Sequence, residues 1–291
     1  MGEKIGFIGF GEAGRTFASG WPGTPPHAFD IKTGDPASRT AQFAAYDQAG
    51  VVGHESAASA LRRADVLLCV VTADQALAAA RDYAPLLKAG ALWLDMNSVA
   101  PDTKRAAAAL IEAAGGRYVD VAVMAPVQPA ARAVPLLVSG PHADDAVDLL
   151  ARSGFTDARK AGAEVGRASA IKMVRSVLVK GLEALTTECV LAADAAGVRD
   201  EVLASLDASW RETSWADRAD YNLDRMIVHG LRRAAEMDEV VKTLDALGTG
   251  SAMARATAER QREIGRRQLR SPDGLDAKIE AISGKRKDQA A

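Results

Sequence analysis

The chain has 291 residues, which is long enough for two domains that each bury a core. Hydrophobic residues make up 48% and charged residues 25%, a composition typical of folded globular proteins and not of disordered ones. The formal net charge of −2 gives no electrostatic argument for a nucleic acid or membrane-surface partner, and no apolar run reaches the length of a membrane span.

The first expected element is a buried strand that turns directly into a helix, within residues 4–14 (KIGFIGFGEAG). The turn carries a G-x-G-x-x-G pattern made by Gly9, Phe10, Gly11, Glu12, Ala13 and Gly14. In such a unit the first glycine allows the tight turn, the second lets backbone approach a pyrophosphate, and the third lets helix pack on strand. The helix N-terminus offers N–H groups to the phosphates. We therefore expect a dinucleotide site, the alternative being a glycine turn without a ligand.

An acidic residue follows where ribose recognition is expected. Asp30 ends the apolar segment 27–30, close to the spacing of about 20 residues found in dinucleotide-binding units. A carboxylate accepts ribose hydroxyls and repels a 2′-phosphate, which favours NAD. NADP is the alternative because Lys32 and Arg39 lie nearby, although we expect both to be solvated surface cations.

The first half of the chain alternates strand-like and helix-like segments. Further strands are expected at residues 51–52, 66–71, 91–95, 118–123 and 136–139, with helices at 75–87 and 101–114. The run at 66–71 is continuously apolar, as in strands that are buried on both faces. This alternation predicts an α/β, doubly wound (Rossmann) parallel sheet with right-handed crossovers.

The pattern changes near residue 160, and no further strand is expected. Residues 166–197 carry apolar residues at helical spacing, which predicts one helix of about 30 residues. Shorter helices are expected at 200–210, 214–228, 232–247, 251–267 and 274–282. We thus predict a dinucleotide-binding domain, residues 1–163, followed by a long helix and an all-α domain, residues 164–291.

The cysteines and histidines give no metal or redox pattern. Cys69 and Cys189 lie in apolar stretches without ligand spacing, so we expect two buried, reduced thiols in a cytoplasmic protein. The first strand begins within five residues of the start, so no signal peptide is expected. His229 has no partner ligands in the pattern, and no metal site is predicted.

Ligands of a doubly wound sheet bind at the carboxyl ends of its strands. The residues at these ends are Val71, Thr72, Asn97, Ser98, Val123 and Met124. We expect the first three to contact the cofactor and the last three to contact the substrate. For Asn97 and Ser98, which precede a proline-started helix, capping that helix is an equally good interpretation.

A lysine near the start of the long helix is a candidate proton carrier. Lys172 follows Ile171 and lies one helical turn from Ala168 and Ser176, close to the apolar stripe. On position alone, the simpler interpretation is a surface lysine whose stem lies on apolar neighbours. If the side chain faces a cleft instead, a partly desolvated ammonium suits general acid/base chemistry.

The whole pattern resembles the β-hydroxyacid dehydrogenase superfamily, which includes 3-hydroxyisobutyrate and 6-phosphogluconate dehydrogenases. The segments that carry the resemblance are GFGEAG at 9–14, DMNS at 95–98, DVAVMA at 120–125 and GRASAIK at 166–172. They are similar to the family's dinucleotide fingerprint, its D-x-S-T loop, its D-A-P-V-S-G substrate loop and its catalytic-lysine segment. The resemblance implies hydride transfer between a nicotinamide and a substrate carbon, with Lys172 relaying the proton. It also implies a homodimer whose all-α domain closes the cleft.

Two segments depart from the family pattern. Where the family has asparagine at the third or fourth position after its lysine, this chain has Arg175 and Ser176. The Ser-Gly-Gly turn that cradles a substrate carboxylate is replaced by residues 124–126 (MAP), and Pro126 lacks an N–H donor. We therefore expect a non-standard substrate, either a substituted hydroxy acid or a bulkier relative. Arg175 would be its cationic anchor and Ser176 a further contact.

The sequence thus predicts an NAD(P)-dependent oxidoreductase that acts on the alcohol/carbonyl pair of a small molecule. Two alternatives stay open: an imine reductase on the same scaffold, against which a lysine at position 172 argues, and a nucleotide-binding sensor without turnover. The segment RRAAEM at 232–237 resembles the C-terminal domain of a poorly characterised branch of the superfamily. Residues of the later helices are expected to be either core and surface residues or the lining of a substrate pocket: Trp210, Trp215, Tyr221, His229, Arg232, Arg233 and Glu236.

Overall fold

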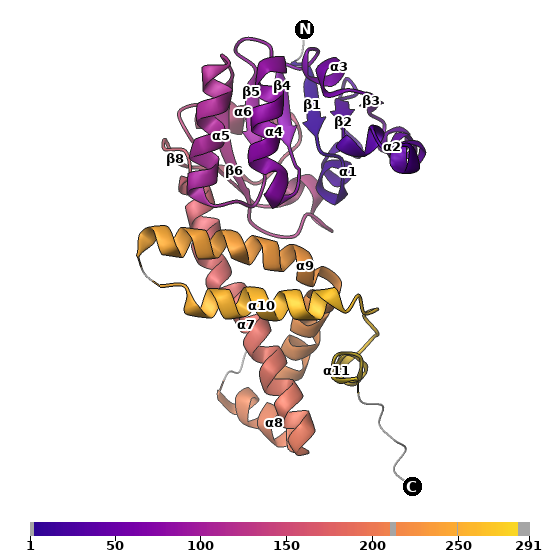
Figure 1. The fold of residues 1–291 in the computed structure, drawn as a ribbon, viewed down its shortest axis with the longest axis vertical. Coiled ribbons are helices and arrows are strands. Elements are labelled where there is room, and N and C mark those ends of the chain that lie inside the picture. The colour runs from indigo at the N-terminus through magenta and orange to yellow at the C-terminus, as the bar shows by residue number, and fades with distance from the viewer. Residues whose placement is uncertain (1–2, 210–213, 249, 285–291) are drawn as a thin grey trace. The chain divides into compact units, whose positions relative to one another are not determined.

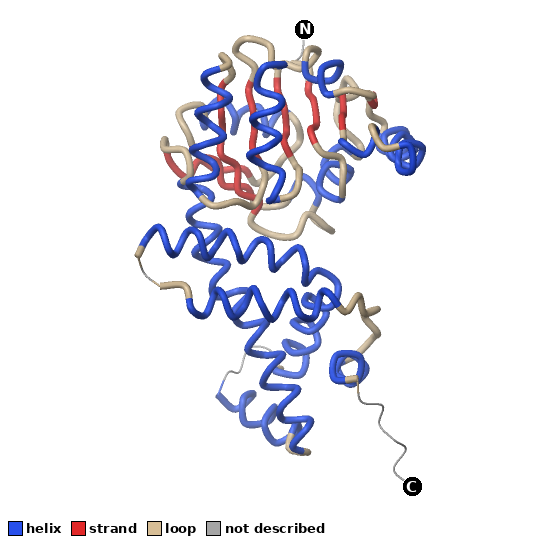
Figure 2. Tube along the Cα trace, viewed as in Figure 1, coloured by secondary structure: helices blue, strands red, loops and turns tan. Residues whose placement is uncertain are grey.

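The computed structural model describes residues 3–209, 214–248 and 250–284, so that Trp210 lies outside the described residues. The chain forms two compact units, residues 1–173 and 174–291. Figure 1 labels their elements, and Figure 2 shows that the strands belong to the first unit while the second is helical.

An eight-stranded sheet forms the centre of the first unit, in the order β3-β2-β1-β4-β5-β6-β7-β8. The strands are β1 (Ile5–Ile8), β2 (His27–Phe29), β3 (Val52–Gly53), β4 (Val66–Cys69), β5 (Leu92–Asp95), β6 (Arg117–Val123), β7 (Leu136–Ser139) and β8 (Ala158–Gly162). Strands β1 to β6 pair in parallel, which confirms the doubly wound α/β class. The chain leaves β1 toward β3 and returns as β4 on the other side of β1. The carboxyl ends of β1 and β4 therefore flank the switch point at which such sheets bind ligands.

Helices cover both faces of this sheet (Figure 2). They are α1 (Glu12–Ala18), α2 (Pro36–Ala49), α3 (Ala57–Leu61), α4 (Ala76–Tyr83), α5 (Pro101–Ala113) and α6 (Ala143–Arg152). One apolar core contains residues of α1, α2 and α6, and a second contains residues of α3, α4 and α5. Neighbouring strand residues alternate between the two cores: Phe7 and Leu68 lie in the first, Ile8 and Leu67 in the second. Burial on both faces explains why these strands are continuously apolar.

The last two strands differ from the expected parallel arrangement. Strand β7 is antiparallel to β6, and β8 then pairs in parallel with β7. Between β6 and β7 the only helical segment is the 3-10 turn Ala131–Ala133, and a chain without a long crossover returns antiparallel. Strand β8 was not expected, because its sequence ARKAG has no apolar face. Arg159 and Lys160 are exposed on it, as charged residues commonly are on edge strands.

Helix α7 (Arg167–Ala196) starts in the first unit and continues into the second. The carboxylate of Asp120 anchors its start, since Oδ2 accepts the N–H groups of Gly166 and Ser169, both at 3.1 Å. The N–H of Ala168 donates to Ser139 Oγ at 3.0 Å. Because these bonds attach the first turn to the sheet, the division between the two compact units falls within the helix, after residue 173.

The second unit is all-helical, with the later part of α7 followed by α8 (Arg199–Ser209), α9 (Trp215–Leu247), α10 (Ala252–Arg266) and α11 (Leu275–Ser283). Helix α9 is a single helix of 33 residues, although two helices separated near residues 229–231 were expected. Gly230 does not break it, because α10 packs against this glycine. A Cβ at Gly230 would lie 2.6 Å from the carbonyl oxygen of Gln261 and 2.9 Å from Cα of Gly265. The glycine is therefore present for close helix packing.

The two cysteines differ in exposure. Cys69 is buried, whereas Cys189 is exposed, so the prediction of two buried thiols is wrong for Cys189. Cys189 lies four residues after Leu185 on α7, and Leu178, Leu182 and Leu185 on the same side of the helix are 67%, 42% and 50% exposed. We call Leu178, Leu182, Leu185 and Cys189 the apolar stripe of α7. Its pattern predicted burial, yet the stripe is uncovered in the single chain.

Two histidines contact each other at one edge of the sheet, His27 at the start of β2 and His54 directly after β3. His27 Nδ1 lies 2.9 Å from His54 Nε2, so one ring donates and the other accepts. Burial lowers the pKa of both rings, with nearby Arg63 adding to the shift. When pH falls below the unfolded-state value of about 6.5, the unfolded chain takes up protons first, so stability present above that pH is lost.

We therefore expect the free energy of unfolding of wild type to fall as the pH is lowered from 7.5 to 5.5. In His54→Gln this fall should be smaller. The expected difference is on the order of 1 kcal/mol or less, because both rings are partly exposed and solvent screens their charges. Urea unfolding of both proteins at the two pH values measures it. An equal loss of stability in wild type and His54→Gln would contradict this assignment.

Candidate functional site

The glycine turn joins β1 to α1 at the switch point of the sheet. Gly9 has a φ of +84°, and a Cβ there would lie 2.8 Å from the carbonyl oxygen of Val70. A Cβ on Gly14 would lie 2.7 Å from the carbonyl oxygen of Gly9, so this glycine lets α1 pack closely on the turn. At Gly11 no atom lies within 4 Å of a Cβ position, which leaves the space beside it open. This is the geometry that a pyrophosphate requires over the start of a helix.

Asp30 is bonded to the same turn. Its Oδ2 accepts the N–H of Phe10 at 2.6 Å, and its Oδ1 accepts the N–H of Lys32 at 2.9 Å. The Phe10 side chain is fully buried, so Phe10 serves packing and this bond, and its N–H is not directed to a phosphate. A carboxylate offers about four acceptor positions, which leaves capacity for ribose hydroxyls. Arg39, on α2, is tied to the segment after Asp30, because its Nε donates to the Thr33 carbonyl at 2.8 Å.

The remaining residues expected at the cofactor surround this turn. Glu12 is exposed and Ala13 half-buried in the first turn of α1, where backbone N–H groups lack intrahelical acceptors. Val71 follows β4, and its Cγ1 would lie 2.9 Å from a Cβ on Gly9. Thr72 is exposed and precedes the 3-10 turn Ala73–Gln75. Val71 is thus adjacent to the turn.

Asn97 lies after β5 and is buried. Its N–H and its Nδ2 donate to Asp95 Oδ1 at 3.0 and 2.7 Å. Its Oδ1 is buried and has no hydrogen-bond partner among the described residues, which is uncommon for a buried amide. The N-cap of α5 is Ala100, so the capping alternative does not apply to Asn97 or Ser98. A buried acceptor of this kind fits the carboxamide donor of a nicotinamide.

Lys172 and Ser98 meet although 74 positions separate them in sequence. The Nζ of Lys172, on the second turn of α7, donates to Oγ of Ser98, on the loop after β5. Lys172 is half-buried, unlike the solvated surface lysine that its position alone favoured. An amine held against a hydroxyl at the carboxyl edge of the sheet can exchange a proton with an alcohol or carbonyl placed beside it.

The end of β6 holds the next pair of predicted substrate contacts. The side chain of Val123 is only 8% exposed and packs in the apolar core. Met124 is half-buried beside Ala122, Leu137 and Ala168, and its N–H donates to the Pro135 carbonyl at 2.9 Å. Of the two, Met124 is the candidate for substrate contact.

Arg175 and Ser176 belong to the helical unit. Arg175 is exposed one turn after Lys172. Ser176 is buried, and its Oγ accepts from Lys180 at 3.4 Å. Lys180 in turn pairs with Glu236 at 2.7 Å, so Ser176 takes part in an internal polar cluster of that unit.

Arg233 and Glu183 form a buried ion pair within the helical unit. Arg233 was expected at the surface but is only 9% exposed, and its Nε donates to Glu183 Oε2 at 2.8 Å. Gln261 donates to the same oxygen at 3.0 Å. Burial raises the pKa of Glu183, which the nearby guanidinium of Arg233 opposes. A buried ion pair of this kind fixes α7, α9 and α10 together.

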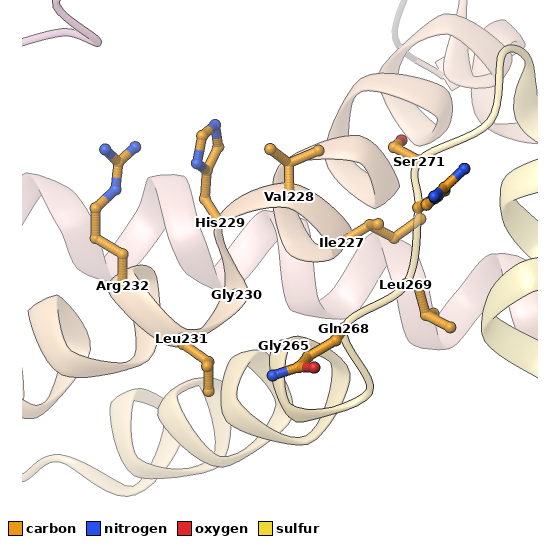
Figure 3. Close-up of a pocket in the computed structure, with 11 residues that line it drawn as sticks. Ile227, Val228, His229, Gly230, Leu231, Arg232, Gly265, Gln268, Leu269 and Ser271 are labelled. Atoms are coloured by element: carbon orange, nitrogen blue, oxygen red, sulfur yellow. The ribbon is translucent and has the colours of Figure 1, made fainter. Parts of the chain in front are cut away.

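His229 and Arg232 instead line a groove of about 620 Å³ within the helical unit (Figure 3). The two side chains point to the same side of α9 as Val228, and Ser271 lies at the opposite end of the view. Arg270 also lines the groove. Arg232 also lies 4.0 Å from Glu236. The carboxylate of Glu236 thus partly offsets the charge of Arg232, and the use of the groove as a substrate pocket stays a prediction.

Sequence reasoning missed several buried cations, one of which lies on α5. Lys104 is fully buried on α5, between Asp95 and Asp120. It could have been found, because Lys104 falls on the same helical face as the buried Pro101, Ala107 and Ile111. A lysine on an apolar helical face needs a buried partner.

Other kinds of site are not evident in the part of the chain that the structure describes. Within it, no group of three or more His, Cys, Asp or Glu side chains is arranged to hold a metal ion. Burial raises the pKa of the Cys69 thiol to about 12, which disfavours a thiolate. No helix in the described ranges is long and apolar enough to span a bilayer.

The fold and the glycine turn define a Rossmann-type nicotinamide nucleotide-binding protein. Residues 4–151 match the family described as the NAD binding domain of 6-phosphogluconate dehydrogenase, and residues 193–264 match a domain of unknown function, DUF1932. The chain belongs to this NAD-binding family and, with it, to the β-hydroxyacid dehydrogenase superfamily. Its helical domain places it in a poorly characterised branch.

Solved structures of similar proteins cover nearly the whole chain. A conserved hypothetical protein from Sinorhizobium meliloti is 36% identical, over 98% of this chain and 97% of its own, with a TM-score of 0.75. A 3-hydroxyisobutyrate dehydrogenase from Mycobacterium tuberculosis is 18% identical, over 96% and 99%, with a TM-score of 0.74. An imine reductase from Streptomyces aurantiacus is 17% identical, over 98% and 100%, with a TM-score of 0.57. The last two share the fold.

Proposed function

We propose that the protein is an NAD(P)-dependent oxidoreductase that transfers hydride between the nicotinamide and the alcohol/carbonyl pair of a substituted hydroxy acid. The observation that carries the proposal is the contact of Lys172 Nζ with Ser98 Oγ at the carboxyl edge of a sheet whose switch point has the dinucleotide fingerprint. Lys172 is the proposed proton relay. Turnover by wild type and by Lys172→Ala tests this role, and the variant is expected to lose it.

The residues of this chain have separate parts in the proposed reaction. Gly9 to Gly14, Asp30 and Asn97 would hold the cofactor, which supplies the hydride acceptor or donor. When an alcohol is oxidised, Lys172 as a neutral amine takes the hydroxyl proton while the carbon loses hydride. In the reverse direction the ammonium returns that proton to the carbonyl oxygen. Ser98 would orient the amine, and Met124 would bound the substrate.

Two other functions are weighed against this one. Imine reduction is the second candidate, because an imine reductase shares the fold. Lys172 argues against it, since a lysine placed to exchange a hydroxyl proton suits an alcohol/carbonyl pair. A nucleotide sensor would bind NADH and turn over no substrate. A screen of hydroxy acids, keto acids and imines with NAD and NADH separates the three, since only one class of substrate, or none, would react.

The position of Asp30 leads to an expected cofactor preference. Wild type should bind NADH at least about tenfold more tightly than NADPH, because a 2′-phosphate beside a carboxylate meets like-charge repulsion. In Asp30→Ser the affinities for NADH and NADPH should become more similar. Asp35→Ser, which alters an exposed acid that caps α2, should keep the wild-type ratio of the two affinities. Fluorescence titration of both reduced cofactors measures the ratio. Tighter binding of NADPH by wild type would contradict the preference.

We also propose a homodimer in which a second copy covers the apolar stripe of α7. Three leucines of that stripe are at least 42% exposed, and contiguous apolar surface of this kind commonly marks an interface. Wild type should then sediment as a dimer, with Cys189 protected from maleimide. Leu178→Glu should yield monomers with a reactive Cys189. The control Met253→Glu changes a residue of α10 that is 59% exposed, against 67% for Leu178, and should stay dimeric. A monomeric wild type with a reactive Cys189 would contradict the proposal.

A further inference from the structure

A buried lysine takes part in the polar network beneath the proposed site, and the proposed reaction makes no use of it. Lys104 is 0% exposed. Its Nζ lies 2.9 Å from Asp95 Oδ1 and 3.4 Å from Asp120 Oδ1, and it donates to the Asp95 carbonyl at 2.6 Å. Desolvating an ammonium costs several kcal/mol, roughly, unless close partners offset it. The two aspartates are those partners.

Asp95 holds the loop that carries Ser98. Its Oδ1 accepts both donors of Asn97, the residue before Ser98. Its Oδ2 accepts the hydroxyl of Tyr118 at 2.7 Å. Burial raises the pKa of Tyr118 well above its usual range, so the phenol stays a donor. Movement of Asp95 would therefore move the backbone on which Ser98 sits.

Asp120 holds the helix that carries Lys172. Besides the N–H groups of Gly166 and Ser169, it accepts the hydroxyl of Ser169 at 2.6 Å and that of Ser139 at 3.0 Å. Ser169 precedes Lys172 by one helical turn. The carboxylate also faces the positive end of the α7 dipole. The position of Asp120 therefore sets the turn from which Lys172 projects.

Asp95 and Asp120 are direct neighbours on adjacent parallel strands. Like charges placed side by side in a sheet repel each other, and burial strengthens that repulsion. The ammonium of Lys104 lies against Oδ1 of both carboxylates and offsets it. Lys104, Asp95 and Asp120 thus connect the loop that carries Ser98 to the helix that carries Lys172.

We propose that Lys104 is a positioning residue, which by clamping Asp95 to Asp120 holds Lys172 Nζ against Ser98 Oγ. The importance of that contact for catalysis rests on the proposed function, whereas the clamp itself does not.

The test uses reagent access to the Lys172 amine, which requires no substrate. The full chain is labelled with trace acetic anhydride, and peptide mass spectrometry follows acetylation of Lys172 relative to the exposed Lys160. The main variant is Lys104→Met/Asp120→Asn, which removes one cation and one anion and so leaves the net charge of the buried cluster unchanged. Asp120→Asn alone, which retains an acceptor for α7, is the second variant. The matched control is Lys88→Met, because Lys88 pairs with Asp65 at 2.8 Å on the half-exposed surface.

In the folded double variant, Lys172 should acetylate about tenfold faster than in wild type, the size expected when one charge-assisted hydrogen bond is lost. Asp120→Asn should give a smaller increase, and Lys88→Met none. Wild-type labelling of Lys172 in either folded Asp120 variant would overturn the positioning role.

Activity gives a second readout. With any substrate that turns over, the double variant should lose kcat by about 100-fold at a similar KM, as small misplacements of a catalytic group do. Absence of turnover by wild type would contradict the proposed function and leave the acetylation comparison intact. Unchanged acetylation together with turnover that needs Lys172 would contradict the role of Lys104 alone.

Discussion

Lys172→Ala is expected to lower kcat by about 10²- to 10⁴-fold, the range that general acid/base catalysis contributes. The amine that exchanges a proton with the substrate oxygen is removed, so hydride transfer would have to expel or capture a proton without a partner. NADH affinity should stay close to that of wild type, because the glycine turn and Asp30 are unchanged. Initial rates of oxidised- or reduced-cofactor formation, together with a fluorescence titration, measure both quantities.

Two further variants show whether the proton or only the charge matters. Lys172→Arg keeps a cation but cannot release a proton near neutral pH, so it should be nearly as inactive as Lys172→Ala. Lys160→Ala removes an exposed lysine that pairs with Asp144 and should behave as wild type. Full turnover in Lys172→Ala would contradict the proposal that Lys172 relays the proton. Full turnover in Lys172→Arg would show that Lys172 acts through its positive charge and not through proton transfer.

Substitutions in the glycine turn should affect stability and cofactor binding separately. Gly11→Ala is expected to keep wild-type stability within about 0.5 kcal/mol, because no atom lies within 4 Å of the new Cβ. The same methyl group occupies the space proposed for the pyrophosphate, so NADH affinity should fall by at least about tenfold, equivalent to about 1.4 kcal/mol. Gly14→Ala should instead destabilise the fold by roughly 1–3 kcal/mol, since its Cβ would meet backbone.

Thermal melts and NADH titrations of both variants measure the two effects. Gly181→Ala is the matched control, because it adds a methyl group in open space on the part of α7 that belongs to the helical unit. It should bind NADH as wild type does. If Gly11→Ala binds NADH normally, the pyrophosphate does not pass over this residue and the assignment of the turn is wrong.

Most of the sheet could be predicted because its information is local. Apolar runs, glycines and helical spacing identify β1, β4, β5 and α7 without knowledge of what packs on them. Strand β8 was missed because an edge strand with exposed Arg159 and Lys160 lacks an apolar period. Helix α9 was divided at Gly230 because a glycine needed by a neighbouring helix resembles a helix break in sequence. In these cases tertiary contacts outweighed local preference.

The candidate site, too, could be predicted only where its residues lie close together in sequence. The glycine pattern and Asp30 lie on consecutive elements, so their proximity follows from the strand-turn-helix unit. The contact between Lys172 and Ser98 joins segments 74 positions apart, and the resemblance to a family, not the spacing, pointed to Lys172. Lys104 could be recognised as buried but not as the partner of two aspartates. The exposure of Cys189 depends on what covers α7, which periodicity does not reveal.

The most direct test of the account is the transfer of deuterium from NADH labelled at C4 to a substrate carbon. Wild type is incubated with either C4-deuterated stereoisomer and a panel of substituted keto acids, and products are analysed by mass spectrometry. The account predicts one deuterium in the hydroxy acid product from one of the two stereoisomers, with the signal lost in Lys172→Ala. Tight NADH binding without deuterium in any product, or with deuterium only in amines formed from imines, would contradict it.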